Sequence, residues 1–192
     1  MQTYSHFIIT AGLKRVAARR RWLPVRGRAF LLGSVLPDLP LLLLTLWYFA
    51  DIRWLRPEMA DAQLFGAWYD DLFFNNLLWI VSHNLFHAPL IILSLGLIGW
   101  RGWKQGRGWG LALLWFAMGC GLHSLIDIFT HHHDGPLLLF PFDLSLRFQS
   151  PVSYWDPRHY GRLFAPLEHL LDVVLLLWLW RSRSTAESGQ VA

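Results

Sequence analysis

Residues 109–130 read WGLALLWFAMGCGLHSLIDIFT, and this stretch decides the fold class of the chain. A helix needs roughly 20 mainly apolar residues to cross a hydrocarbon core of about 30 Å, and this run is long enough and carries no Lys or Arg. Its second half nevertheless contains His123 and Asp127. A charge at the membrane centre costs about 3 kcal/mol even on lenient scales, so ionisable residues in a span indicate a function.

The composition also favours a membrane protein. Of the 192 residues, 54% are hydrophobic and only 16% are charged. The mean hydropathy is +0.33, whereas soluble domains carry about 25% charged residues. Three more segments resemble the first, so we expect an all-α, polytopic membrane protein with about four transmembrane helices, at 29–50, 72–100, 109–130 and 164–180.

The remaining segments complete one domain. A short amphipathic helix is expected at 3–21, ahead of the spans. We expect a single helical membrane domain over 1–181, followed by a polar, disordered tail over 182–192. A soluble all-α enzyme with these segments as core helices is the alternative, but the runs are long and rich in leucine for that class.

Basic residues gather beside the predicted spans. Seven of the 17 Lys and Arg residues precede the first span, and "RGWKQGRG" follows the second. We therefore interpret the net charge of +4 as a topology signal or a contact for anionic membrane lipids, and expect no nucleic-acid partner. By the positive-inside rule, both termini and the loop 101–108 lie in the cytoplasm. The lone Cys120 excludes an internal disulfide.

Three predicted spans each carry two potential metal ligands one helical turn apart. Side chains at i and i+4 share a helix face, and helical bundles build metal sites from such pairs. Imidazole and carboxylate groups suit zinc, manganese, iron or nickel. The pairs are His83 and His87, His123 and Asp127, and Glu168 and Asp172.

Several neighbouring candidates have two readings. His131 would extend the stripe of the third span by one turn, although the run 131–133 also fits a solvated loop. Glu168 and Asp172 suit ligands, or partners that orient ligand histidines. His169 suits a hydrogen-bonded core residue.

Prolines predict breaks in the first two spans. Pro37 and Pro40 bracket Asp38, and Pro89 follows His87 closely. A proline lacks the N–H that continues a helix. Irregular backbone at membrane depth is tolerated only where it is buried in protein or lines a wet cavity. We therefore expect both breaks to face a shared central cavity.

The motifs SHFIIT, GSVLPDLP, SHNLFHAPL and GLHSLIDIFT, with GPLLLFPF after them, occur in an order that resembles the YdjM-like membrane-bound metal-dependent hydrolases. The resemblance covers residues 4–148. The chain departs from the family pattern at Pro40, where a second acid is common, at Asn84, where Arg is commoner, and in the Phe-His-Ala context of the second motif. A more distant similarity of pattern links it to zinc-dependent phospholipase C. The resemblance implies a metal site made of His6, Asp38, His83, His87, His123 and Asp127.

The residues and the resemblance together predict a membrane-embedded metal-dependent hydrolase. Zinc is the expected ion, and Asp38 is the expected catalytic base for the attacking water. Arg158 and Arg162 are candidates to bind a phosphate or carboxylate group of the substrate, although both also suit ordinary loop charges. A phosphoester or lipid substrate fits the location, and the resemblance implies a bacterial-type inner membrane.

Two other functions are compatible with the same residues. Buried His and Asp residues also form proton relays, so proton or metal transport is one alternative. Four short spans without an inverted repeat make a poor transporter, however. The other alternative is a scaffold stabilised by metal, whose site would be closed by protein ligands where a catalytic site keeps an open position.

Overall fold

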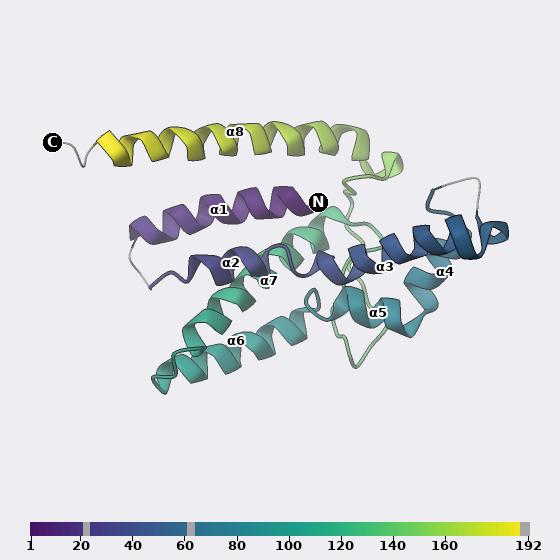
Figure 1. The fold of residues 1–192 in the computed structure, drawn as a ribbon, viewed down its shortest axis with the longest axis horizontal. Coiled ribbons are helices and arrows are strands. Elements are labelled where there is room, and N and C mark those ends of the chain that lie inside the picture. Colours follow the sequence, from purple (N-terminus) through teal and green to yellow (C-terminus); the bar gives the residue numbers. More distant parts are fainter. Residues whose placement is uncertain (21–23, 61–63, 189–192) are drawn as a thin grey trace.

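The computed structural model describes residues 1–20, 24–60 and 64–188, and these parts of the chain form helices and no strand (Figure 1). The predicted all-α class is confirmed. A π-helical turn, Asp51–Leu55, extends α3, and 3₁₀ turns occupy Pro57–Met59 and Pro157–His159. The α-helices are α1 (Thr3–Arg20), α2 (Gly27–Gly33), α3 (Asp38–Ala50), α4 (Ala67–Asn75), α5 (Leu77–Asn84), α6 (Pro89–Lys104), α7 (Gly110–Thr130) and α8 (Gly161–Ser188).

Helix α7 packs against α6 along its length and crosses α2 at very short distance. A Cβ atom added to Gly33 would lie 2.2 Å from the carbonyl oxygen of Phe116, and one added to Gly119 would lie 2.3 Å from that of Phe30. Small residues allow helix backbones to approach closely in membranes. The two glycines therefore fix the position of the chain segment that follows α2.

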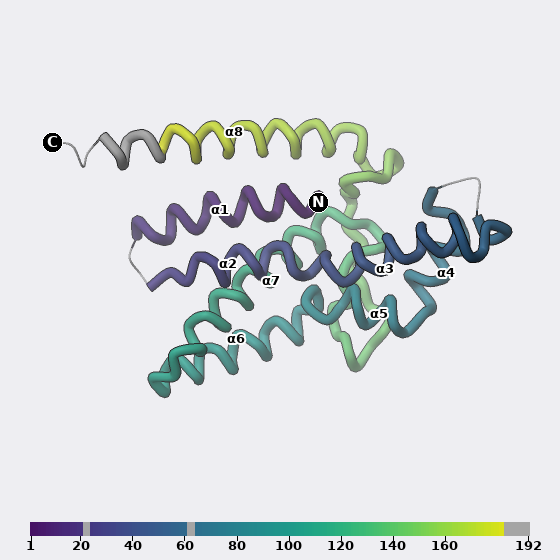
Figure 2. The backbone as a smooth tube through the Cα atoms, viewed as in Figure 1, coloured from purple at the N-terminus to yellow at the C-terminus, as the bar shows by residue number. Residues whose placement is uncertain are grey.

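Two of the predicted spans are broken helices, as the prolines indicate, and Figure 2 follows both bends along the backbone. Helix α2 and the extended α3 meet at 44°, and α5 and α6 meet at 46°. Pro37 precedes the first residue of α3, and Pro89 is the first residue of α6. Because proline has no N–H to donate, each break leaves backbone carbonyl groups without their helical partners.

Helices α1 and α8 lie side by side and run in the same direction (Figure 1). The backbone N–H of Gln2 donates to Glu168 over 2.8 Å, and the hydroxyl of Ser5 donates to Asp172 over 2.7 Å. Both carboxylates are buried. They therefore fix the N-terminal end of α1 against α8.

The amphipathic helix predicted at 3–21 is α1 over its described residues, but its polar face points inward. His6 and Thr10 are buried, whereas Phe7 and Leu13 are each 43% exposed. Helix α8 likewise buries its two carboxylates and exposes most of its leucines and valines. This inverted pattern is expected where lipid surrounds the helices, because polar groups must then find partners inside the protein.

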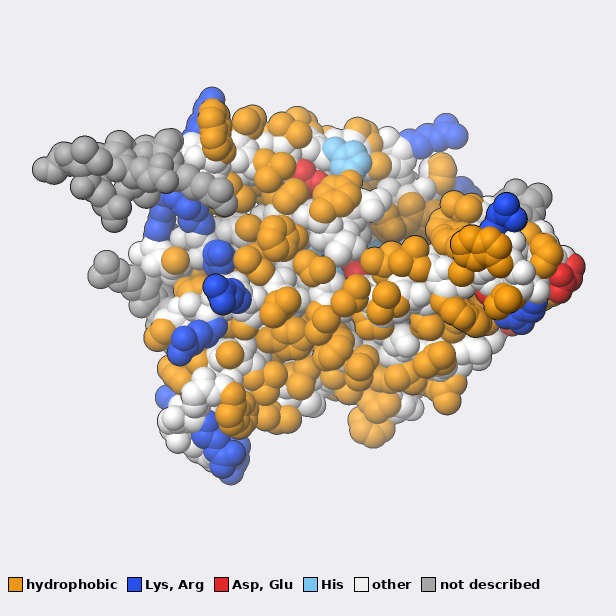
Figure 3. Space-filling model, in the orientation of Figure 1, with side chains coloured by type: hydrophobic (Ala, Val, Ile, Leu, Met, Phe, Trp, Pro, Cys, Tyr) orange, Lys and Arg blue, Asp and Glu red, His pale blue; other side chains and the backbone are white. Residues whose placement is uncertain are grey.

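Helices α7 and α8 are each long and apolar enough to cross a membrane, and there are four candidate spans if each bent pair counts as one. Figure 3 shows hydrophobic side chains over most of the visible face, with most of the visible Lys and Arg side chains gathered at the left end and a few at the right. The left end is called the basic end. That end contains the end of α1, the start of α2 and the turn between α6 and α7. Its exposed basic residues are Arg19, Arg20, Arg26, Arg28, Arg101, Lys104 and Arg107.

The connection between α7 and α8, residues 131–160, is attached to α5. Leu137 is fully buried and packs in one cluster with Ile80 and Ala88. Its N–H donates over 2.8 Å to the side-chain oxygen of Asn84, whose amide nitrogen donates to the carbonyl of Ile80. The connection therefore covers the region around the second helix break.

The end of α8 overlaps the predicted tail. Helix α8 runs to Ser188, so it continues past residue 182, where the sequence predicts disorder. Residues 181–188 contain neither Gly nor Pro, so no strong helix-terminating residue occurs there. Residues 189–192 of the predicted tail lie outside the described residues.

Candidate metal centre

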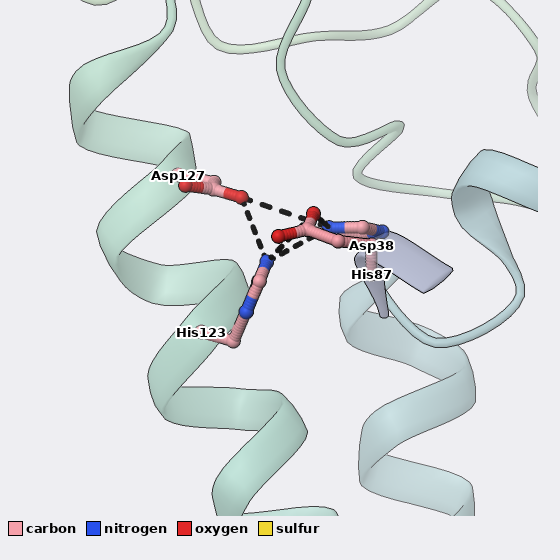
Figure 4. Close-up of side chains that lie close together, drawn as sticks. All are labelled: Asp38, His87, His123 and Asp127. Atoms are coloured by element: carbon pink, nitrogen blue, oxygen red, sulfur yellow. Dashed lines mark hydrogen bonds and ion pairs between the residues drawn. The ribbon is translucent and has the colours of Figure 1, made fainter. Parts of the chain in front are cut away.

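Four potential metal ligands meet where α3, the α5–α6 break and α7 come together (Figure 4). One donor atom from each of Asp38, His87, His123 and Asp127 lies within 4.8 Å of the other three. Asp38 is the first residue of α3, His87 lies in the break, and the other two lie one turn apart on α7. We call these four residues the four-donor cluster.

The spacing of the donor atoms suits a single divalent ion. Nε2 of His123 lies 3.0 Å from Nε2 of His87, 3.0 Å from Oδ2 of Asp127 and 3.3 Å from Oδ1 of Asp38. Nε2 of His87 lies 3.4 Å from the same Asp38 oxygen and 3.6 Å from the same Asp127 oxygen. Bonds of about 2.0–2.1 Å to a tetrahedral ion place neighbouring ligand atoms ~3.3 Å apart. The five distances lie on both sides of that value.

Backbone carbonyl groups orient both imidazoles of the cluster. Nδ1 of His87 lies 2.5 Å from the carbonyl oxygen of His83, and Nδ1 of His123 lies 2.9 Å from that of Ser34. A carbonyl group only accepts, so each Nδ1 carries a hydrogen and each Nε2 is left to face the cluster. Metal-binding histidines are oriented by the same kind of hydrogen bond at the opposite ring nitrogen.

The helix breaks provide these carbonyl groups. In an unbroken helix, the carbonyl of residue i accepts from the N–H of residue i+4. Ser34 lies in the first break, and the N–H of His87 in the second break donates to Asn84 instead of His83. The breaks therefore place two of the ligands and also free the acceptors that fix the imidazole rings.

Asp127 has a second set of contacts at Oδ1, the oxygen that faces away from His123. Nε2 of His6 lies 3.0 Å from this oxygen, the amino group of Met1 lies 2.9 Å from it, and Nε2 of His131 lies 3.6 Å from it. The His6 ring also stacks on the His123 ring, with centroids 3.7 Å apart. His6 and His131 thus contact the cluster through Asp127, and neither belongs to the four.

Asp38 is the most accessible member of the cluster. Its side chain is 25% exposed, whereas those of the other three are 6% exposed or less. Its Oδ2 accepts a hydrogen bond of 2.6 Å from the hydroxyl of Thr3, while Oδ1 faces the histidines. Water therefore reaches the cluster most readily beside Asp38.

The structure corrects the expectation for His83. Its spacing from His87 predicts that both residues address one point, and the resemblance assigns both to the metal. Helix α5 ends at Asn84, however, so His87 lies beyond the helix, although the two rings remain neighbours with centres 4.6 Å apart. His83 packs against Phe73, with ring centroids 5.1 Å apart, and its nitrogens lie outside the four-donor cluster. Neither nitrogen has a hydrogen-bond partner among the described residues.

The polar residues of α8 serve the contact with α1. Glu168 and Asp172 bind Gln2 and Ser5, as described above, and lie outside the four-donor cluster. His169 is 54% exposed, so its predicted place in the core is wrong. One residue corresponds to about 100° of rotation around a helix, so His169 points away from the face that buries Glu168.

The two arginines predicted to bind a substrate anion lie at the surface. Arg158 is 80% exposed and pairs with Asp156 over 2.9 Å. This guanidinium lowers the pKa of Asp156 to about 2. Arg162 is exposed at the start of α8. Within the described residues, neither arginine contacts the four-donor cluster.

Several residues of the site were not identified from the sequence. They are the Thr3 hydroxyl, the Ser34 carbonyl, and Ser124, whose hydroxyl donates to the carbonyl of His87. No motif marks them, because a backbone carbonyl belongs to every residue and serine and threonine occur throughout the chain.

Comparisons with family models, curated proteins and solved structures found no match for this chain. The similarity to the YdjM-like hydrolases stays a prediction from sequence motifs, and the four-donor cluster is argued from its geometry alone.

Proposed function

We propose that the protein is a membrane-embedded metal-dependent hydrolase whose ion is held by the four-donor cluster. One observation carries the proposal. The buried imidazoles of His87 and His123 each donate a hydrogen bond from Nδ1 to a backbone carbonyl group. Their Nε2 atoms therefore face each other and the carboxylates of Asp38 and Asp127. Burial of uncompensated charge costs several kcal/mol per ion, and a divalent cation would balance both carboxylates.

Two imidazole nitrogens and two carboxylate oxygens suit zinc, with manganese, iron or nickel as alternatives. A divalent ion in such a site acts as a Lewis acid that activates water and polarises the scissile group. With His87, His123 and Asp127 as the three ligands, the fourth position would stay open for water. Asp38, the cluster member that solvent reaches most readily, would accept the proton of that water.

The position of the cluster along α7 supports access from one side of the membrane. Helix α7 starts at Gly110, next to the basic turn at 101–108. At 1.5 Å per residue, His123 and Asp127 lie about 20–25 Å further along the axis, in the far half of a core of about 30 Å. The substrate would enter from the side opposite the basic end.

The same pattern supports a location. With each bent pair counted as one span, the chain crosses the membrane four times between the start of α2 and the end of α8, and both of these points lie on the basic side. Met1 itself lies beside Asp127, in the opposite half, so the two termini do not share one side. The positive-inside rule makes the basic side the cytoplasm. Together with the resemblance to the YdjM-like family, this supports a multi-pass protein of a bacterial-type inner membrane. A phosphoester or other lipid-type substrate suits a site near the opposite head-group level.

Metal content and turnover test the proposal together. We would purify the full chain in detergent and compare the wild type with His123→Ala and with His169→Ala, which removes an exposed histidine. Elemental mass spectrometry should give about one ion per chain for the wild type and His169→Ala, and little for His123→Ala. The metal-loaded forms would then be tested on phosphomonoester and phosphodiester lipids in mixed micelles. A wild type that takes up no metal after reconstitution would refute the proposal.

A second candidate function rests on α8. Glu168 and Asp172 each have a buried oxygen without a hydrogen-bond partner among the described residues, and buried acids in spans often belong to proton pathways. Proton or metal flux into vesicles containing the protein would favour transport if Glu168→Gln and Asp172→Asn abolish it. The hydrolase proposal predicts no such flux.

A further inference from the structure

Arg147 is a half-buried cation without a carboxylate partner in the described part of the chain. Its guanidinium lies 5.8 Å from the ring centre of Phe73 and 5.6 Å from that of Phe74. One of its five N–H groups donates to the carbonyl of Gly135. Burial lowers the pKa of the guanidinium, and the charge of Asp134 opposes that change. An arginine in this position stays charged and keeps donors for an anion.

Asp134 does not form an ion pair with Arg147. Its Oδ2 lies 3.0 Å from Nδ1 of His131 and accepts a hydrogen bond of 3.0 Å from the indole N–H of Trp155. The Asp134 carboxylate is therefore held by His131 and Trp155. The arginine faces aromatic rings and one backbone carbonyl instead.

The carbonyl group that binds Arg147 lies beside the C-terminal end of α7. A Cβ atom on Gly135, whose carbonyl binds Arg147, would lie 3.3 Å from Cβ of His131 and 3.7 Å from the carbonyl oxygen of Asp127. Arg147 is also held in place by its bridge to the buried Leu137. The loop 131–160 therefore holds Gly135, the backbone partner of Arg147, against the end of α7 that carries two of the four donors.

His83 contacts the same Phe73 ring as Arg147, and it also lies beside His87 of the four-donor cluster. Its ring centre is 5.1 Å from that of Phe73 and 4.6 Å from that of His87. The side chain is more than nine-tenths buried, yet neither ring nitrogen has a hydrogen-bond partner in the described residues. An imidazole always carries at least one N–H, so His83 has a donor to offer a ligand.

We propose that Arg147 and His83 form a subsite for the phosphoryl group of a substrate, next to the metal ligand His87. The inference rests on the proposed hydrolase function and names its substrate class. A planar guanidinium with unused N–H groups and a neutral imidazole donor suit the oxygens of a phosphoryl anion. Arg147 thereby takes the role that the sequence suggests for Arg158 and Arg162.

Phosphoryl binding without turnover tests this subsite. We would titrate inorganic phosphate into the full chain in neutral detergent, with and without metal, and follow binding by phosphorus NMR. A second arm would use phosphatidate in phosphatidylcholine nanodiscs, which separates a lipid head group from free phosphate. Each arm would compare the wild type with Arg147→Gln, His83→Gln and Arg162→Gln. The last variant removes an equal charge from an exposed arginine.

Arg147→Gln should weaken phosphoryl binding by about tenfold or more in at least one arm. His83→Gln should weaken it less, and Arg162→Gln should match the wild type. Metal content should be unchanged in all three variants, which separates this subsite from the metal centre. If Arg147→Gln does not fold, Arg147→Lys, which keeps the charge but loses the planar fork, should still weaken binding.

Three results would overturn the inference. They are absence of binding by the wild type in both arms, equal binding by wild type and Arg147→Gln, and an equal loss in Arg162→Gln. A protein that binds phosphate through Arg147 but holds no metal would refute the proposed hydrolase and leave the anion subsite standing.

Discussion

Two pairs of potential ligands have the same spacing along the chain, but the structure brings both members of only one pair into the four-donor cluster. His123 and Asp127 lie four residues apart on α7, and both belong to the four-donor cluster. His83 and His87 are also four residues apart, but only His87 belongs to it. The first pair lies within one continuous helix of 21 residues, whereas α5 ends between the members of the second pair.

The difference shows that spacing positions ligands only where the helix continues. On α7 the helical repeat alone brings both side chains to one face. At the second break, His87 reaches the cluster because the chain leaves the helix, and its Nδ1 then takes the carbonyl of His83. His83 contributes to the metal centre through its backbone, and its side chain faces Phe73 and is free for another role.

The largest effect on metal affinity should come from a substitution in the second pair, His83 and His87. His87→Ala should reduce metal affinity by more than about 100-fold, since loss of even an outer hydrogen-bond partner typically costs 10–100-fold. His83→Ala should reduce it by less than about tenfold, because the carbonyl that orients His87 remains. Competition with a chromogenic chelator in detergent would measure both affinities. Similar losses in the two variants would mean that the His83 side chain reaches the ion.

The next largest effect, on the free energy of unfolding, concerns the close approach of α7 to α2, just before the break between α2 and α3. Gly119→Ala should lower the free energy of unfolding by about 2–3 kcal/mol, because the new Cβ would meet backbone atoms of α2 that cannot move independently. It should also weaken metal binding, since Ser34, which orients His123, follows α2 directly. Denaturant titration in micelles, followed by tryptophan fluorescence, would measure stability.

Gly121→Ala is the matched control for that substitution. A Cβ on Gly121 would make an ordinary contact of 3.5 Å with a methyl group of Ile92. Alanine is favoured over glycine in a helix by about 1 kcal/mol, so stability should stay the same or rise. Equal destabilisation by both alanines would show that the close crossing of α2 and α7 does not require glycine at position 119.

The third effect concerns the partner of Asp127. His6→Phe keeps an aromatic ring to stack on His123 and removes the hydrogen bond to Asp127. Metal affinity should fall by about 10–100-fold, the usual cost of losing a partner that orients a ligand. His169→Phe alters an exposed histidine of α8 and should leave the affinity unchanged. If His6→Phe abolished binding as completely as His87→Ala, His6 would itself be a ligand.

Sequence patterns predicted the parts of the molecule that depend on local composition. The apolar run at 109–130 corresponds to α7 within one residue, and the prolines at 37 and 89 mark both breaks. Asp38, His87, His123 and Asp127 were all among the predicted ligands. These features follow from helix length, helix periodicity and the missing N–H of proline, which act over a few residues.

What the sequence did not reveal depends on contacts between distant segments. Whether His83 or His6 joins the four donors depends on where α5 ends and how α1 lies against α7. The choice of Arg147 over Arg158 as the proposed anion site depends on packing of Arg147 against Phe73 and Phe74, more than 70 positions earlier in the chain. The sequence predicts α1 as an amphipathic helix, but which of its faces points inward depends on its partners on α8, more than 160 residues away.

The smallest effect should come from the contact that joins the second break to α7. The Ser124 hydroxyl donates to the carbonyl of His87. Ser124→Ala should lower the free energy of unfolding by about 1 kcal/mol, the usual net value of one hydrogen bond. Ser94→Ala removes an exposed hydroxyl that bonds only within α6, and should change stability by less than about 0.5 kcal/mol. Denaturant titration of both variants would measure the difference. If the two substitutions changed stability equally, the break between α5 and α6 would fix the position of His87 without the hydrogen bond from Ser124 on α7.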